Sequence, residues 1–126
     1  MIIYPSIDDV LVAHARLITR FGGGGGLRDH GALEAALARP QTGYYADVIE
    51  QAAALMESLS QNHPFVDGNK RAAISVTAAF LRINGFRLQF VDIRAYEFLI
   101  ELYETNNFRF EQLIIWLRQH ATQTRE

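Results

Sequence analysis

The chain has 126 residues, of which 49% are hydrophobic, and this size and composition favour a single domain, residues 1–126, with one core. It has no cysteine, which excludes disulfides and thiolate metal sites, and its net charge of -2 gives no general attraction to nucleic acid or to anionic membranes. Because no basic and apolar leader begins the chain and no apolar run reaches the ~18 residues of a membrane helix, we expect a cytoplasmic protein that contacts neither membrane nor nucleic acid.

The first helix is predicted from about residue 7 to residue 21. Residues 6–9 resemble a capping box, and apolar residues follow at helical spacing as far as the glycines. Gly22 to Gly26 must end this helix, and we expect them to form a flexible loop. A phosphate-binding loop is disfavoured, because the glycines lack the Gly-x-x-x-x-Gly-Lys-Ser/Thr pattern and a preceding strand.

Five more helices are predicted after the glycines, most of them bounded by a capping aspartate, a proline or a glycine. Their expected ranges are 29–39, 47–62, 69–84, 92–106 and 110–122. Between them, Tyr44 and Tyr45 lie in a loop, where they either pack on the core, which we favour, or border a pocket. Residues 86–90 alternate like a short strand without an evident partner, so an extended connection is the alternative. We expect residues 123–126 to fray.

The helix predicted at residues 69–84 is expected at the centre of the domain. Its residues 72–83 are apolar on nearly every face, which is typical of a helix enclosed on all sides. The N-terminus of a helix presents unpartnered N–H groups and about +0.5 of an elementary charge, so it is a ready anion site. We therefore predict an all-α bundle around this helix, with the functional loop at its N-terminus.

Two basic residues, Lys70 and Arg71, stand in the first turn of this helix, where they oppose the helix dipole. A negative group such as a phosphate among them is the simplest explanation. Arg71 can grip a phosphate with its planar fork, while Lys70, the single lysine of the chain, can act as a point charge. The alternative is a solvated basic pair.

The residues before the helix suggest further roles. His63, which Pro64 biases toward extended backbone, is a candidate general base, although a histidine bonded at a helix end is the more common case. Asp67 could hold Mg²⁺ against phosphate oxygens, or cap the helix, or do both. Asn69 either binds a phosphate or ribose oxygen or braces the turn, and Phe65 is expected to fill the core.

The remaining histidines, His14, His30 and His120, show no metal-ligand spacing, and we expect them on the surface or at helix ends. A metal-dependent phosphohydrolase is therefore a weak hypothesis, because His63 and Asp67 alone are too few ligands for a stable metal site.

Residues 63–71, with the sequence His-Pro-Phe-Val-Asp-Gly-Asn-Lys-Arg, resemble the signature of the Fic/Doc superfamily. They are most similar to its death-on-curing (Doc) toxin branch, in which Lys stands where most Fic proteins carry Gly. Residues 26–29, 33–41 and 80–85 are also similar to Doc-like chains, so the resemblance spans about residues 1–120. It implies an all-helical fold and transfer of part of a nucleoside triphosphate to a hydroxyl of a protein.

The resemblance also implies a role for each residue of the motif. His63 would be the base for the target hydroxyl, and Asp67 would contact Mg²⁺. The implied sites are, for catalysis, His63, Asp67, Lys70 and Arg71; for nucleotide binding, Gly68, Asn69, Lys70 and Arg71; for metal, Asp67; and for the structure of the loop, Pro64 and Phe65.

The resemblance implies two possible reactions: ordinary Fic proteins move AMP from ATP, whereas Doc toxins are similar to them in fold but move the γ-phosphate, with elongation factor Tu as the target. Lys70 would fill space that an α-phosphate needs, which favours a toxin kinase that inhibits translation and is restrained by a Phd-like antitoxin. Pro64 and Gly68 look more like ordinary Fic proteins, so AMP transfer is the alternative. A catalytically silent binding module is a further hypothesis.

Overall fold

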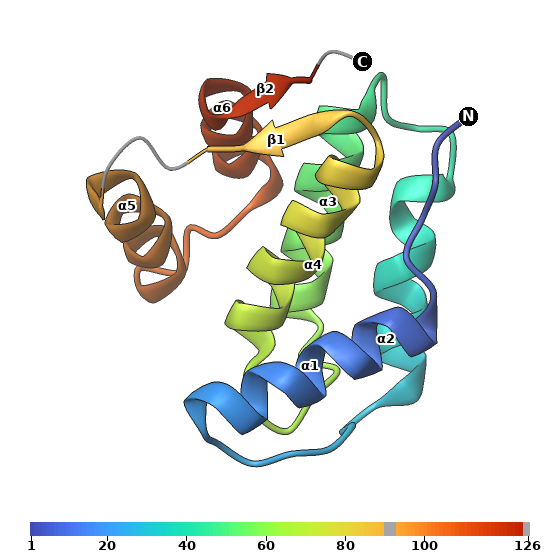
Figure 1. Ribbon diagram of the computed structural model, residues 1–126, viewed down its shortest axis with the longest axis vertical. Coiled ribbons are helices and arrows are strands. Elements are labelled where there is room, and N and C mark those ends of the chain that lie inside the picture. The colour runs from blue at the N-terminus through green and yellow to red at the C-terminus, as the bar shows by residue number, and fades with distance from the viewer. Residues whose placement is uncertain (90–92, 125–126) are drawn as a thin grey trace.

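The computed structural model describes residues 1–89 and 93–124. These residues form six α-helices, a short 3₁₀ helix (η1) and two short strands (Figure 1). The elements are α1 Ile7–Phe21, α2 His30–Ala38, η1 Arg39–Gln41, α3 Val48–Gln61, α4 Asn69–Ile83, β1 Phe86–Leu88, α5 Ile93–Glu104, α6 Phe110–His120 and β2 Ala121–Gln123. The predicted all-α fold is confirmed, and none of the described helices is long and apolar enough to cross a membrane.

Side chains cap three helices at the predicted places. At the start of α1, Ser6 accepts a hydrogen bond from the N–H of Asp9, and the carboxylate of Asp9 accepts one from the N–H of Ser6. Asp29 and Asp47 cap α2 and α3 with one hydrogen bond each, which their carboxylates accept from the N–H groups of Ala32 and Glu50. Each such cap stabilises a helix by about 1 kcal/mol. The predicted cap of α5, Asp92, lies outside the described residues.

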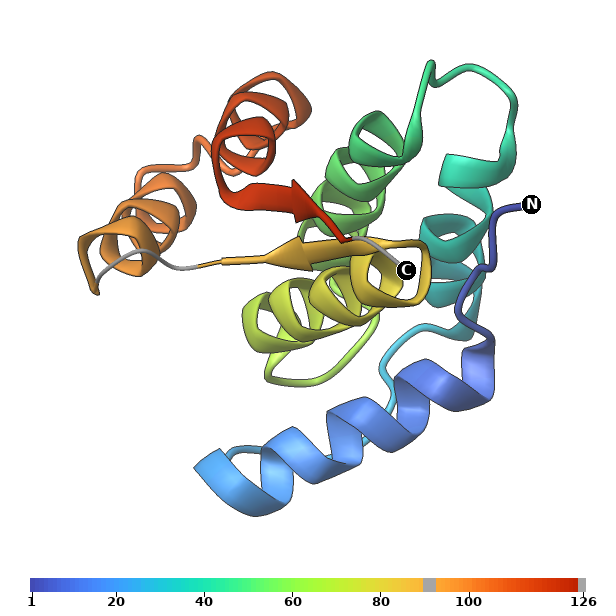
Figure 2. The ribbon, with the colours of Figure 1, turned by 45° about the horizontal axis from the view of Figure 1, so that its top comes forward.

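The most enclosed helix is α3, which packs against α2, α4 and α6 (Figures 1 and 2). Ten of its 14 residues are buried. The prediction that residues 69–84 are enclosed on all sides is wrong, because α4 exposes Ser75, Ala79 and Arg82 along one face. Small residues are compatible with either a buried or an exposed helix face, so counting apolar residues could not reveal this side.

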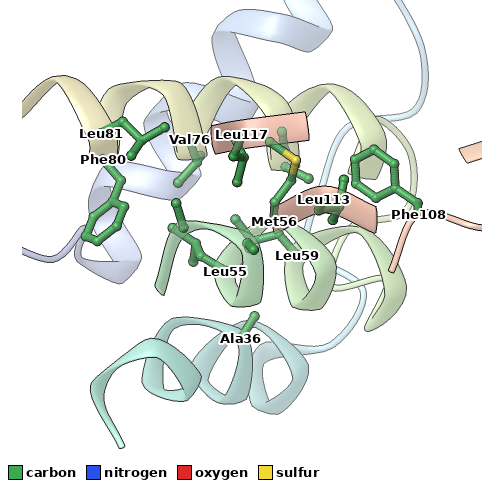
Figure 3. Close-up of a cluster of buried hydrophobic side chains, with 14 of the residues drawn as sticks. Ala36, Leu55, Met56, Leu59, Val76, Phe80, Leu81, Phe108, Leu113 and Leu117 are labelled. Atoms are coloured by element: carbon green, nitrogen blue, oxygen red, sulfur yellow. The ribbon is translucent and has the colours of Figure 1, made fainter. Parts of the chain in front are cut away.

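Large apolar side chains of α4 and α6 pack against α3. Figure 3 shows Leu55, Met56 and Leu59 of α3 among side chains of α4 and α6, with the small Ala36 of α2 on the other side. Burying each of the large side chains stabilises the fold by about 1.5–3 kcal/mol. This core fixes the direction of α4 and therefore the position of its N-terminus.

The strand predicted at residues 86–90 forms as β1, and its partner is β2. The strands are antiparallel, with Phe86 opposite Gln123 and Leu88 opposite Ala121. The last helix therefore ends at His120 rather than at residue 122. The prediction that the chain frays from Gln123 is wrong for the described residues, because Gln123 pairs with Phe86. The backbone groups of β1 would otherwise be unpaired, and β2 supplies their hydrogen-bond partners.

The turn after α4 gathers both ends of the described chain. The side chain of Asn84 accepts a hydrogen bond from the N–H of Ile3 and donates one to its carbonyl, both at 2.8 Å. The N–H of Thr124 donates to the carbonyl of Gly85 at 2.8 Å. Gly85, with φ +90°, ends the helix as predicted.

Arg39 joins η1 to α3 through an ion pair with Glu57, with Nη1 and Oε1 2.6 Å apart. Its Nε also donates to the hydroxyl of Tyr45, which packs on Phe110 of α6. The expected core packing of the two tyrosines is therefore right for Tyr45, whereas Tyr44 is 85% exposed.

Candidate active site

The loop between α3 and α4 is tied to the segment that follows the glycines. The N–H of Val66 donates to the carbonyl of Gly26 at 3.1 Å, and the N–H of Arg28 donates to the carbonyl of Pro64 at 2.7 Å. Leu27 and Phe65 form an antiparallel bridge between these two segments. Segments that are 35 or more residues apart thus hold the loop in one conformation.

His63 is exposed at the end of α3, and its backbone is left-handed, with φ +49°. The expectation of an extended His63 is therefore wrong. The guanidinium of Arg28 explains the difference, because its Nε donates to the carbonyl of His63 at 2.6 Å and its Nη2 donates to that of Asn62 at 3.0 Å. A non-glycine residue in this region costs about 1–2 kcal/mol, and such strain is often found at functional sites.

Phe65 is 1% exposed and anchors the loop in the core. Its N–H donates to Oδ1 of Asn69 at 2.9 Å, and its carbonyl accepts from Nδ2 of Asn69 at 3.0 Å. The side chain of Asn69 therefore braces the turn, which was one of its two predicted roles. A contact from Asn69 to a nucleotide would rest on its backbone N–H.

Asp67 does not cap α4, and this alternative is wrong. The N-cap is Gly68, whose φ of +78° is left-handed. Oδ1 of Asp67 accepts from the N–H of Gly68 at 2.8 Å, and Oδ2 accepts from the N–H of Gly24 at 3.3 Å. Within the described residues no side chain caps the first turn of α4, so its N–H groups remain available to an anion.

The two cations of the motif lean toward different neighbours. The ammonium of Lys70 lies 5.3 Å from the ring centroid of Tyr103 on α5, and the guanidinium carbon of Arg71 lies 4.6 Å from that of Phe21 at the end of α1. A hollow of about 390 Å³ opens at the head of α4; we name it the α4 hollow. Its lining residues are His63, Val66, Asp67, Gly68, Asn69, Lys70, Arg71 and Tyr103.

The α4 hollow has the size and chemistry of a site for a polyphosphate. Small-molecule pockets measure about 300–1,000 Å³, and this one combines two cations, a helix N-terminus and a single carboxylate. Across residues 1–89 and 93–124 no group of three His, Cys, Asp or Glu side chains could hold a metal by itself. Asp67 fits a Mg²⁺ ion that arrives with phosphate oxygens, since Mg²⁺ typically takes one or two carboxylates together with substrate phosphates.

His14 is part of this region, and its expected place on the surface or at a helix end is wrong. It is 3% exposed, its ring stacks on Phe65 with the centroids 3.7 Å apart, and its Nε2 lies 2.7 Å from the carbonyl oxygen of Asp67. The sequence signal for its burial, though not for its partner, is its spacing, four residues after Val10 and three before Leu17 on the apolar face of this helix. His30 and His120 do lie at helix ends.

The chain is similar to known proteins. The model of the Fic/DOC family matches residues 4–81, which include every motif residue of the α4 hollow. The chain belongs to the Fic/DOC family. This Fic/DOC chain is 47% identical over 90 residues to Toxin Doc of Mycolicibacterium smegmatis, covering 68% of this chain and 67% of that protein. It is 32% identical over 87 residues to Protein kinase doc of Escherichia phage P1, covering 66% and 69%.

Proposed function

We propose that this protein is a Doc-type toxin that transfers a phosphoryl group from ATP to a hydroxyl group of a protein target. The observation that carries the proposal is the α4 hollow, where an exposed imidazole, one carboxylate and two cations surround a helix N-terminus that no described side chain caps. The similarity to a relative named Toxin Doc supports the toxin, and the similarity to one named Protein kinase doc supports phosphoryl transfer.

In this proposal each residue performs one part of the reaction. His63 lies exposed at the rim, where a macromolecular substrate can reach it, and accepts the proton of the attacking hydroxyl. Lys70, Arg71 and the first N–H groups of α4 bind the phosphates of ATP. Mg²⁺, bound with ATP beside Asp67, would neutralise charge on the phosphate oxygens. Positioning and charge neutralisation supply most of the catalysis in phosphoryl transfer.

The proposed target is a translation factor such as elongation factor Tu, and the proposed result is growth arrest. This assignment rests on the resemblance of residues 63–71 to the Doc signature and on the similarity to Toxin Doc. A toxin with an open site needs restraint from a separate protein, and we propose a Phd-like antitoxin. The proposed target places this action in the cytoplasm.

Radiolabelled ATP tests the proposal. The purified protein, Mg²⁺ and elongation factor Tu are incubated with γ-labelled or α-labelled ATP, and label on the factor is measured. We expect transfer of the γ-label, a loss of about 10²- to 10⁴-fold in His63→Ala, and no loss in the control His30→Ala, since His30 is an exposed histidine of α2 outside the hollow. Transfer of neither label to the factor, together with unaltered toxicity of His63→Ala, would favour a silent binding module.

The position of Lys70 supports a second candidate, AMP transfer. Its ammonium lies 5.3 Å from the ring centroid of Tyr103, and AMP transfer requires that the side chain stay there while an α-phosphate lies at the first turn of α4. Transfer of the α-label in place of the γ-label would establish this reaction and reject the kinase.

A further inference from the structure

We infer that His14 is a positioning residue that fixes the peptide group between Asp67 and Gly68 and, through it, the Asp67 carboxylate. The inference deepens the proposed function, because it rests on Asp67 acting in the α4 hollow. His14 itself does not line the hollow, and it is placed on α1, 53 residues before Asp67.

The bond between His14 and Asp67 determines the tautomer of the imidazole. Nε2 lies 2.7 Å from the carbonyl oxygen of Asp67, and a carbonyl oxygen can only accept a hydrogen bond. Nε2 must therefore carry a proton. The ring is held nearly parallel to Phe65, at 5°, and is 3% exposed, so the donor keeps one direction.

Holding this carbonyl also sets the direction of the next N–H group. In a trans peptide the C=O and N–H bonds point in opposite directions, and the described residues contain no cis peptide bond. With the Asp67 carbonyl directed to His14, the N–H of Gly68 points the other way and donates to Oδ1 of Asp67 at 2.8 Å. A rotated peptide group would remove this donor from the carboxylate.

The packing around Gly68 shows that the imidazole and the turn fit closely. A Cβ on Gly68 would lie 3.3 Å from Cδ1 of Ile18, tighter than most real contacts, and 3.4 Å from Nε2 of His14, at the limit of ordinary contact, and φ there is +78°. His14 and Ile18 are one turn apart on α1. The same helix therefore supplies the hydrogen bond and the wall that hold the turn.

A purely structural role for His14 would require only a buried ring of this shape. The hydrogen bond goes instead to the backbone of an exposed residue whose carboxylate oxygens are both held by N–H groups, from Gly68 and Gly24. Groups that orient a metal-binding carboxylate typically change metal affinity or activity by about 10- to 100-fold when removed.

Two variants separate the hydrogen bond from the ring. His14→Phe keeps an aromatic ring against Phe65 but has no donor. His14→Gln loses the ring but carries an amide nitrogen the same number of bonds from Cα as Nε2. Circular dichroism checks folding, and ¹⁵N NMR reports the Gly68 amide and, in the unaltered protein, the ring tautomer. Phosphoryl transfer is measured against Mg²⁺ concentration.

We expect the ring proton on Nε2 in the unaltered protein and a shifted Gly68 amide in His14→Phe. We also expect transfer by His14→Phe to be about 10- to 100-fold lower or to need more Mg²⁺, with most of the loss recovered in His14→Gln. If NMR of the unaltered protein shows the His14 ring protonated on Nδ1 alone, that result by itself overturns the inference. A folded His14→Phe with an unchanged Gly68 amide and an unchanged Mg²⁺ dependence would also overturn it. So would losses of phosphoryl transfer in both variants that are explained by their lower melting temperatures alone.

The two proposals fail in different ways. If the unaltered protein transfers no group while the Gly68 amide moves in His14→Phe and not in His14→Gln, the proposed function fails and the positioning role stands. If transfer occurs and both variants match the unaltered protein, the positioning role fails and the proposed function stands.

Discussion

Replacing Gly23 by alanine tests whether the glycine loop holds the Asp67 carboxylate in place. A Cβ on Gly23 would lie 2.6 Å from Oδ2 of Asp67, whereas a Cβ on Gly26 would meet no described atom within 4 Å. The two glycines have nearly the same φ, at +111° and +108°. Gly26→Ala is therefore a matched control, because it introduces the backbone strain without the contact.

The two variants should lose similar amounts of stability. An alanine held at such a φ costs about 1–3 kcal/mol, which lowers the melting temperature by roughly 4–12 °C for a chain of this size. The contact adds little to this loss at Gly23, because the atom in the way is the end of a side chain that can move. To restore a separation of 3.0–3.4 Å, Oδ2 of Asp67 must retreat by about 0.4–0.8 Å.

The displacement of the carboxylate should appear in activity. A misplacement of about 1 Å can cost 10²-fold in rate, so we expect phosphoryl transfer by Gly23→Ala to fall about 10- to 100-fold below that of Gly26→Ala. Circular dichroism gives the melting temperature of each variant. The γ-label assay, run at a temperature where both variants are folded, gives their transfer activities. Equal activities would refute the idea that the glycine loop sets the position of Asp67.

Three further predictions concern stability. Thr77 has a buried hydroxyl with no hydrogen-bond partner in the part of the chain that the structure describes, so Thr77→Val should raise the free energy of unfolding in urea by about 1 kcal/mol; a lower value would contradict this. Glu57→Ala should lower the free energy of unfolding by about 2–3 kcal/mol, because the partly buried Arg39 loses its carboxylate partner and keeps only neutral ones, and Glu57→Gln should lower it less in the same titration. The pKa of Asp9 is lowered from 3.8 mainly by the hydrogen bond from the N–H of Ser6. The stability that this carboxylate contributes is therefore complete above pH 3.8 and is lost as the pH falls through its lower folded-state pKa. In melting curves at falling pH, Asp9→Asn should therefore lose less stability than the unaltered protein.

Features that depend on a few neighbouring residues were predictable from the sequence. The capping box at Ser6, the aspartate cap at Asp47 and the glycine at position 85 act within one turn of a helix, and all three have the expected role. The motif of residues 63–71 is likewise local, and its polar residues do gather around one hollow.

Features that depend on distant partners were not predictable in the same way. His14 meets the backbone carbonyl of Asp67, and no side-chain pattern reports on a carbonyl 53 residues away. The left-handed His63 depends on the guanidinium of Arg28, 35 residues earlier. The pairing of β1 with β2 joins segments separated by all of α5 and α6, so a strand without a nearby partner could not be distinguished from an extended connection.

The turn at Asn84 and Gly85 couples the first and last described segments of the chain. Ile3 is bonded to the side chain of Asn84, and Thr124 to the carbonyl of Gly85, so an opening of this turn releases both segments together. In amide hydrogen exchange the two positions should therefore behave as one cooperative unit, with similar protection that is lost together under mild denaturant. Asn84→Ala should therefore lower the exchange protection of the Thr124 amide, although the side chains of Asn84 and Thr124 share no bond in the described structure. The Gly85 carbonyl that accepts from Thr124 lies in the same turn, and that turn would lose its two hydrogen bonds to Ile3.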